Sequence, residues 1–139
     1  MGARITKVFV TGASGFIGAH VTRALLSRGH SVAVLAVPGD PLWRLQDVGE
    51  RVAIATGTIN DIETVRKTLT EFKPEACIHL AWYAEPGKYL NSAENIPSLT
   101  GSLILFNELT KVGCRQVLVA GTCAEYDTNY KVNPPLRTV

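Results

Sequence analysis

The sequence predicts a doubly wound α/β domain, in which helices cover both faces of a sheet of about five parallel strands. Three observations predict it. Short apolar runs rich in β-branched residues recur along the chain, segments with helical spacing separate them, and a glycine-rich turn joins the first run to the first helix. Alternating strands and helices, connected by right-handed crossovers, build a parallel sheet covered on both sides.

The predicted strands are short and nearly continuous in apolar residues, as strands buried on both faces are. In chain order they are Ile5 to Val10, Ser31 to Val37, Val52 to Ala55, Ala76 to Ala81, and Gln116 to Ala120. Between the second and third strands, Pro38 to Pro41 predicts a turn, and Leu42 to Val48 is at most a short helix.

Three helices are predicted from apolar residues that recur every three or four positions, and such a stripe normally faces the core. The stripes are Ile17, Val21, Ala24 and Leu25; Ile62, Val65 and Leu69; and Ile96, Leu99, Leu103 and Phe106. Gly29 and Gly113 are placed to end the first and last helices, and Asp61 is a suitable N-cap for the middle one.

Composition excludes several classes of protein. Hydrophobic residues make up 46% and charged residues 19% of the 139 positions, so the chain is not intrinsically disordered. The net charge is +2 with no basic run longer than two, so a nucleic-acid partner is not expected. No apolar stretch is long enough to span a bilayer, so a membrane partner is not expected either.

The three cysteines are too few for a disulfide framework, which favours reduced thiols and a cytoplasmic location. The three histidines lie on different elements, so no metal site is expected.

The most informative segment is Thr11 to Gly18, which follows the first strand and opens the first helix. Gly12 and Gly15 suit a tight turn whose backbone approaches a pyrophosphate, because glycine permits positive φ and has no side chain in the way. Gly18 would let the helix pack closely, and the free N–H groups of the helix start would attract the anion. An ordinary glycine-rich turn is the weaker alternative.

With three further motifs, the chain resembles the extended short-chain dehydrogenases/reductases, the NAD(P)-dependent epimerase/dehydratase family with a Rossmann fold. The motifs follow the third, fourth and fifth strands: Gly57-Thr58-Ile59-Asn60-Asp61, His79-Leu80-Ala81-Trp82, and Gly121-Thr122-Cys123-Ala124-Glu125-Tyr126. The resemblance implies NAD or NADP as cofactor and Thr122 as a catalytic residue, four positions before a structural Tyr126. Thr122 could instead be a turn residue that hydrogen-bonds its own backbone.

The glycine turn, these motifs and the end of the second strand together give the candidate cofactor-binding residues. They are Gly12, Ser14, Gly15, Phe16, Ile17, Gly18, Val37, Arg44, Thr58, Ile59, Leu80, Ala81 and Trp82. Trp82 and Tyr83 could also flank a substrate or simply cover the end of the fourth strand. Thr58 stands where the family has an adenine-side aspartate.

The choice between NAD and NADP depends on the end of the second strand. An NAD-preferring fold usually has an acidic residue there for the ribose diol, but Ala36 and Val37 occupy the position. Arg44 could meet a 2′-phosphate, and Asp40 could serve the diol if the loop bends back. Strong specificity for NAD is therefore not expected.

The resemblance also implies a catalytic Tyr-x-x-x-Lys pair, which these 139 residues do not contain. We therefore expect residues 1–126 to be an NAD(P)-binding domain and residues 127–139 a loop leading to a missing catalytic and substrate-binding part. The parent would be a nucleotide-sugar epimerase, reductase or dehydratase, and a possible homodimer, whereas the chain alone would be inactive. Cys123 and Ala124 replace the acid and base of the dehydratases, which favours an epimerase or ketoreductase. The alternative is a non-catalytic NAD(P)-binding or sensing module.

Overall fold

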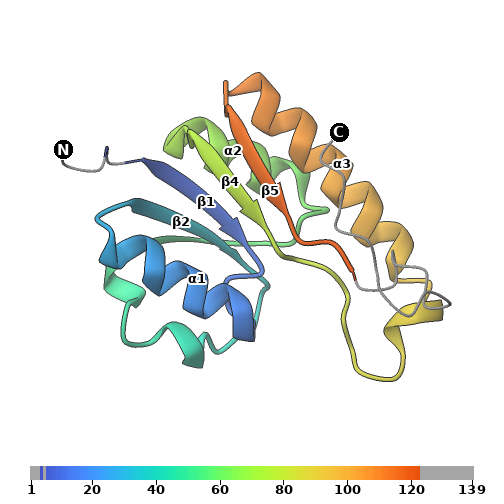
Figure 1. Ribbon diagram of the computed structural model, residues 1–139. Helices are drawn as coiled ribbons and strands as arrows, with labels where there is room; N and C mark the ends of the chain where they lie inside the picture. Colours follow the sequence, from blue (N-terminus) through green and yellow to red (C-terminus); the bar gives the residue numbers. More distant parts are fainter. Residues whose placement is uncertain (1–3, 5, 123–139) are drawn as a thin grey trace, which may run out of the picture.

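The computed structural model describes residue 4 and residues 6–122, which form one parallel sheet with helices on both faces (Figure 1). All neighbouring strands pair in parallel, in the order β3-β2-β1-β4-β5. The strands are β1 (Lys7–Thr11), β2 (Ser31–Ala36), β3 (Val52–Thr56), β4 (Ala76–His79) and β5 (Gln116–Val119). The predicted doubly wound fold is confirmed, with its topological switch between β1 and β4.

The helices are α1 (Phe16–Ser27), α2 (Ile62–Phe72) and α3 (Asn95–Lys111), with short 3-10 turns at Trp43–Leu45, Gly49–Arg51 and Tyr89–Asn91. In Figure 1, α1 covers one face of the sheet, while α2 and α3 cover the other. The predicted helix ends are confirmed. Gly29 and Gly113 have φ of +81° and +78°, and the Asp61 side chain accepts a hydrogen bond from the Thr64 N–H.

Alternate residues of the central strands supply two separate hydrophobic clusters, one on each side of the sheet. Val8 and Val10 of β1 pack with α1, whereas Phe9, between them, packs with α2 and α3. All three side chains are at most 4% exposed, as expected where both faces of a parallel sheet are covered. The central strands thus form a rigid base for the loops at their carboxyl ends.

The predicted core stripe of α3 is wrong. Ile96, Leu99 and Leu103 are 68%, 50% and 60% exposed, although Phe106 is partly buried against the core. The buried face of α3 consists of Ser98, Gly101, Ser102, Leu105, Glu108 and Leu109. Small residues at this face let the helix approach the loop after β3 closely, since a Cβ added to Gly101 would lie 2.6 Å from Ile59 Cγ1.

Several sequence predictions fall on parts of the chain that the structure does not describe. Ile5, Cys123, Tyr126 and the expected loop 127–139 lie outside the described residues, so the domain boundary stays a prediction.

Cys77 and Cys114 are free cysteines. Among the described helices, none combines the length and the hydropathy that a transmembrane span requires.

Candidate functional site

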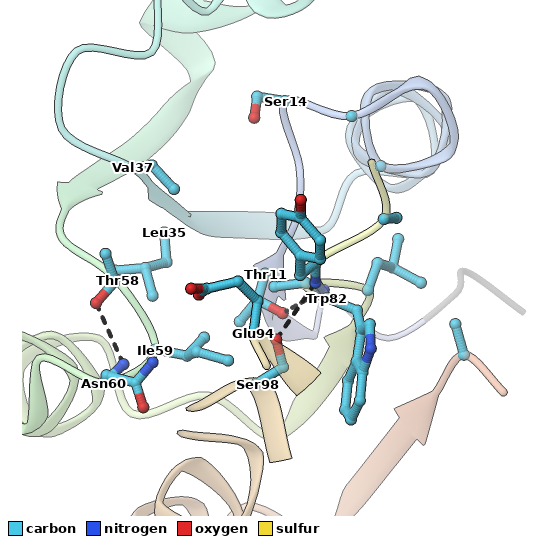
Figure 2. Close-up of a pocket in the computed structure, with 18 of the residues that line it drawn as sticks. Thr11, Ser14, Leu35, Val37, Thr58, Ile59, Asn60, Trp82, Glu94 and Ser98 are labelled. Atoms are coloured by element: carbon cyan, nitrogen blue, oxygen red, sulfur yellow. Dashed lines mark hydrogen bonds between the residues drawn. The ribbon is translucent and has the colours of Figure 1, made fainter. Parts of the chain in front are cut away.

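A cavity of about 810 Å³ opens at the carboxyl ends of the strands (Figure 2). This size lies within the range of small-molecule and cofactor sites, and the position is where open α/β sheets bind their ligands. Twelve of the predicted site residues line it: Gly12, Ser14, Gly15, Phe16, Ile17, Gly18, Val37, Thr58, Ile59, Leu80, Ala81 and Trp82. Residues from four loops of the chain therefore meet in one cavity.

The glycine turn is built on close backbone contacts. Gly12 has a φ of +70°, and a Cβ added there would lie 2.8 Å from both the Ala81 nitrogen and the Leu80 carbonyl carbon. Gly18 packs against the turn itself, since a Cβ on it would overlap the Gly12 carbonyl oxygen. The turn and the end of β4 thus depend on each other for their positions.

The start of α1 is open toward the cavity. Its N-cap, Gly15, has extended backbone, no side chain caps the helix, and its first turn carries no acidic residue. Phe16 and Ile17, the first two helical residues, line the cavity and are 71% and 64% exposed. Uncapped N–H groups and the positive end of the helix dipole attract an anion, so this end of the cavity fits a pyrophosphate.

One wall of the cavity comes from β2 and from the loop after β3. Val37 is 57% exposed, whereas Ile59 is buried. The Thr58 hydroxyl accepts a hydrogen bond from the Asn60 N–H at 3.3 Å, so it supports its own turn. Figure 2 shows these residues opposite Trp82, with Ser14 at a third side. Apolar side chains thus dominate this wall.

Arg44 and Asp40 lie beside this wall and do not line the cavity. The Arg44 guanidinium stacks on the Trp43 ring at 4.0 Å from its centroid and donates a hydrogen bond to the Ser14 carbonyl at 3.3 Å. The Asp40 carboxylate accepts a hydrogen bond from the Leu42 N–H at 2.9 Å and so stabilises its own loop. Of these two charges, only Arg44 reaches the turn that opens α1.

The opposite wall is formed by residues 80–84 and the start of α3. Trp82 Nε1–H donates to the Asn95 side chain at 2.9 Å, which fixes the indole at the cavity edge. The Tyr83 hydroxyl donates to Glu85 at 2.8 Å, and this hydrogen bond raises the pKa of Tyr83 above its ordinary value. Tyr83 is therefore protonated at neutral pH.

Sequence reasoning missed part of this lining. The additional residues are Thr11, Leu35, Gly57, Asn60, Ala84, Glu94, Pro97, Ser98 and Ala120, whereas the sequence indicates Tyr83 only as a candidate neighbour of a substrate. Thr11 and Gly57 directly adjoin predicted positions and were recoverable from the motifs. Glu94, Pro97 and Ser98 carried no such signal, because only folding brings the start of α3 back to the end of β4.

Thr122 follows β5, is exposed and does not line the cavity. The structure thus places Thr122 at the same edge of the sheet as the glycine turn without bringing the two together. No group of histidine, cysteine or carboxylate side chains in the described part of the chain is arranged to hold a metal ion.

A parallel sheet whose carboxyl edge combines a glycine turn, an uncapped helix start and a cavity defines the class of Rossmann-type nucleotide-binding proteins. Within it, the chain belongs to the NAD dependent epimerase/dehydratase family, whose model matches residues 8–138.

The similar proteins include nucleotide-sugar enzymes. A UDP-glucose 4-epimerase from Neisseria meningitidis serogroup C is 30% identical over 138 residues, covering 91% of this chain and 39% of the relative. The Thermus thermophilus UDP-glucose 4-epimerase, solved in complex with NAD, superposes with a TM-score of 0.71 at 29% identity, covering 80% of this chain and 36% of that one. The Thermotoga maritima enzyme, solved with UDP-glucose, has a TM-score of 0.78 at 24% identity, covering 94% and 45%. The chain spans less than half the length of each of these three proteins.

Proposed function

We propose that this chain is the NAD-binding part of a nucleotide-sugar epimerase. The observation that carries the proposal is the uncapped start of α1, which opens into the cavity directly after a glycine turn. Family membership and the relative solved with NAD support the same cofactor. When bound, NAD would accept and return a hydride at a sugar carbon.

The residues fit distinct parts of a dinucleotide. The backbone of Gly12 to Gly18 would hold the pyrophosphate, and Val37, Thr58 and Ile59 would flank one half of the molecule. Leu80, Ala81 and Trp82 would flank the other half. Arg44 would act from outside the cavity, through the Ser14 carbonyl that it already contacts.

The binding test is Gly15→Val, because this position is the N-cap of the helix that opens into the cavity. Gly15 has extended backbone, with φ −69° and ψ 171°, and a Cβ there would lie 3.2 Å from the Gly12 carbonyl oxygen, so the turn has to move by a few tenths of an ångström. Calorimetry on the full-length protein should show NAD affinity falling by at least about tenfold, since the branched side chain obstructs the anion site. Gly49→Val is the matched control, because a Cβ at Gly49 has nothing within 4 Å. Unchanged NAD affinity in a folded Gly15→Val protein would refute the proposal.

We further propose that residues 1–126 are the cofactor domain, that a nucleotide-sugar is the substrate, and that Thr122 assists a tyrosine supplied beyond this chain. Epimerase or ketoreductase chemistry is favoured over dehydration because Cys123 and Ala124 offer no acid–base pair. Thr122→Ala should lower kcat by about 10² while leaving NAD affinity unchanged, since positioned acid–base groups contribute at about this level. A fully active Thr122→Ala enzyme would remove Thr122 from the mechanism.

A full-length protein that binds NAD without turning over any nucleotide-sugar would support the alternative function, a non-catalytic sensing module.

The exposed row Ile96, Leu99 and Leu103 on α3 supports a homodimer of the complete protein, because soluble proteins normally cover contiguous apolar surface. Leu99→Glu should convert the dimer to a monomer in sedimentation experiments, and an unchanged mass would contradict this interface.

The free cysteines Cys77 and Cys114 support a cytoplasmic location, which cell fractionation can test.

A further inference from the structure

A buried chain of hydrogen bonds lies beneath the cavity and centres on His79, the last residue of β4. His79 is 2% exposed. Its Nδ1 lies 2.6 Å from the Thr11 hydroxyl at the end of β1, and its Nε2 lies 2.8 Å from the Ser102 hydroxyl on α3. One imidazole ring thus joins two neighbouring strands to the helix that packs against them.

The direction of these hydrogen bonds follows from the outermost acceptor. The Ser102 hydroxyl lies 2.7 Å from the Ser98 carbonyl, which can only accept, so Ser102 donates its single proton there. Toward His79, Ser102 must then accept, and the ring proton is placed on Nε2. In a neutral ring Nδ1 is then an acceptor, so the Thr11 hydroxyl donates to it.

The surroundings keep the ring neutral. Burial lowers the pKa of His79 below its ordinary value. The ring edge packs at 87° against Phe106, with centroids 5.5 Å apart, and both of its hydrogen-bond partners are uncharged hydroxyls. An imidazolium would also donate from Nδ1 to the Thr11 oxygen, which would remove the acceptor that Nδ1 offers to the Thr11 hydroxyl proton in the neutral ring. The neutral ring with its proton on Nε2 satisfies each contact.

The outer ends of this chain hold the wall of the cavity. The Ala81 N–H donates to the Thr11 hydroxyl oxygen at 3.3 Å, and the Tyr83 N–H donates to the Ser98 hydroxyl oxygen at 3.3 Å. Residue 81 is therefore held by a hydroxyl that His79 contacts directly. Residue 83 is held by the side chain of Ser98, the residue whose backbone carbonyl accepts the hydrogen bond from Ser102. The backbone of residues 80 and 81 is also what Gly12 packs against.

We propose that His79 is a positioning residue that, through the hydroxyls of Thr11 and Ser102, holds residues 80–83 where the dinucleotide binds. The inference rests on the proposed NAD-binding function and adds to it the residues that shape one wall of the site. His79 itself does not line the cavity, so its effect on the ligand is exerted through the backbone of this segment.

The first test is spectroscopic and needs no ligand. Nitrogen-15 NMR of histidine-labelled full-length protein at neutral pH should show His79 as the neutral tautomer with its proton on Nε2, with the resonance assigned by its loss in His79→Asn. A proton on Nδ1, or a charged ring, would overturn the inference.

The second test compares three threonine variants by NAD titration. Thr11→Val removes the hydroxyl while keeping the shape of the side chain, and should weaken NAD binding by about tenfold, in the range for removal of a buried hydrogen-bond partner. Thr11→Ser keeps the hydroxyl and should restore affinity to within about twofold of the wild type. Thr22→Val is the matched control: Thr22 is equally buried, on α1, and its hydroxyl has no hydrogen-bond partner within the described chain.

The outcomes separate this inference from the proposed function. Absence of NAD binding by the wild type would refute the proposed function, whatever the tautomer of His79. Normal wild-type binding with an unchanged Thr11→Val would refute the inference alone, as would equal losses in Thr11→Val and Thr22→Val. Because Thr11 itself lines the cavity and Ser102 does not, Ser102→Ala tests the other side of the ring without touching the ligand and should also weaken NAD binding. Unchanged NAD affinity in Ser102→Ala would refute the inference, whether or not Thr11→Val folds.

Discussion

Helices α1 and α2 begin at the same edge of the sheet, after β1 and β3, but their first turns are built differently. At α2 the Asp61 carboxylate accepts hydrogen bonds from the Thr64 N–H at 3.1 Å and the Thr64 hydroxyl at 2.7 Å, and Glu63 adds a second acidic group. At α1 the N-cap is Gly15, and neither a capping side chain nor an acidic residue is present.

This difference shows how one electrostatic feature can serve either stability or binding. Every helix start offers free N–H groups and a partial positive charge, which a side chain or a ligand can satisfy. In α2 the protein satisfies them itself. In α1 it leaves them open toward the cavity, which gives up the stabilisation of a cap and leaves them available to the pyrophosphate of the proposed cofactor.

The largest effect is expected from giving α1 the cap that α2 has. Gly15→Asp places a carboxylate at a position whose extended backbone suits a capping residue. NAD affinity should fall about a hundredfold, roughly 2.7 kcal/mol, while the melting temperature does not fall. Gly15→Asn, of equal size but uncharged, is the control in calorimetry. Equal losses for the two variants would show that size rather than charge governs the site.

Glu108 is a second carboxylate that, like Asp61, stabilises the protein itself. It lies on α3 and binds Arg66 of α2. Arg66 donates to it at 3.0 and 3.2 Å and Lys111 at 2.7 Å, and these hydrogen bonds lower the pKa of Glu108 to about 2. Because the folded-state pKa is depressed, the stabilisation is complete above the ordinary carboxyl pKa and is lost as pH falls toward 2. Glu108→Gln should lower the melting temperature at pH 7 by several degrees. The gap from the wild type should narrow between about pH 5 and 2, and a constant gap would contradict this assignment.

The end of β2, like the first turn of α1, has no acidic residue. This predicts weak discrimination between NAD and NADP. Ala36 and Val37 offer no carboxylate, while Arg44 already contacts the Ser14 carbonyl. Arg44→Ala should weaken NADP binding by about fivefold and NAD binding by less than about twofold, with Arg44→Lys intermediate for NADP. A wild-type preference for NAD of a hundredfold or more would contradict the prediction.

The smallest effect is expected from opening α2. Asp61→Ala removes the cap and should lower the melting temperature by a few degrees without changing NAD affinity. Hydrogen bonds from Thr64 lower the pKa of Asp61, so the cap contributes above the ordinary carboxyl pKa and is lost as pH falls through the lowered value. The difference from the wild type should therefore disappear in acid. Weaker NAD binding in Asp61→Ala would show that α2 also contributes to the site.

Most of the fold and one half of the cavity could be predicted from the sequence, because local rules determine them. β-branched runs, helical spacing and capping residues specify the elements, and the glycine turn requires a positive φ at Gly12. Thr58, Leu80 and Ala81 were found because they belong to two motifs that resemble those of the family, and parallel strands end at one edge of the sheet.

The other half depends on tertiary packing, which α3 shows clearly. Its regular apolar stripe faces outward, whereas Ser98, Gly101 and Ser102 face inward. Close approach to Ile59 requires small residues on the inner face, and hydrogen bonds to His79 and the Ser98 carbonyl satisfy the buried Ser102 hydroxyl. A periodicity argument ranks such polar and small residues as surface, so it assigned the wrong face.

The placement of the two tryptophans has a practical consequence in terms of fluorescence. Trp82 lines the cavity, and Trp43 stacks on Arg44, which contacts the turn at the start of α1. These are the only tryptophans in the chain. A ligand in the cavity would change the surroundings of Trp82 directly and could reach Trp43 only through Arg44. The emission of these two tryptophans should therefore report occupancy without a label, and Trp43→Phe and Trp82→Phe would assign the signal to either side of the cavity.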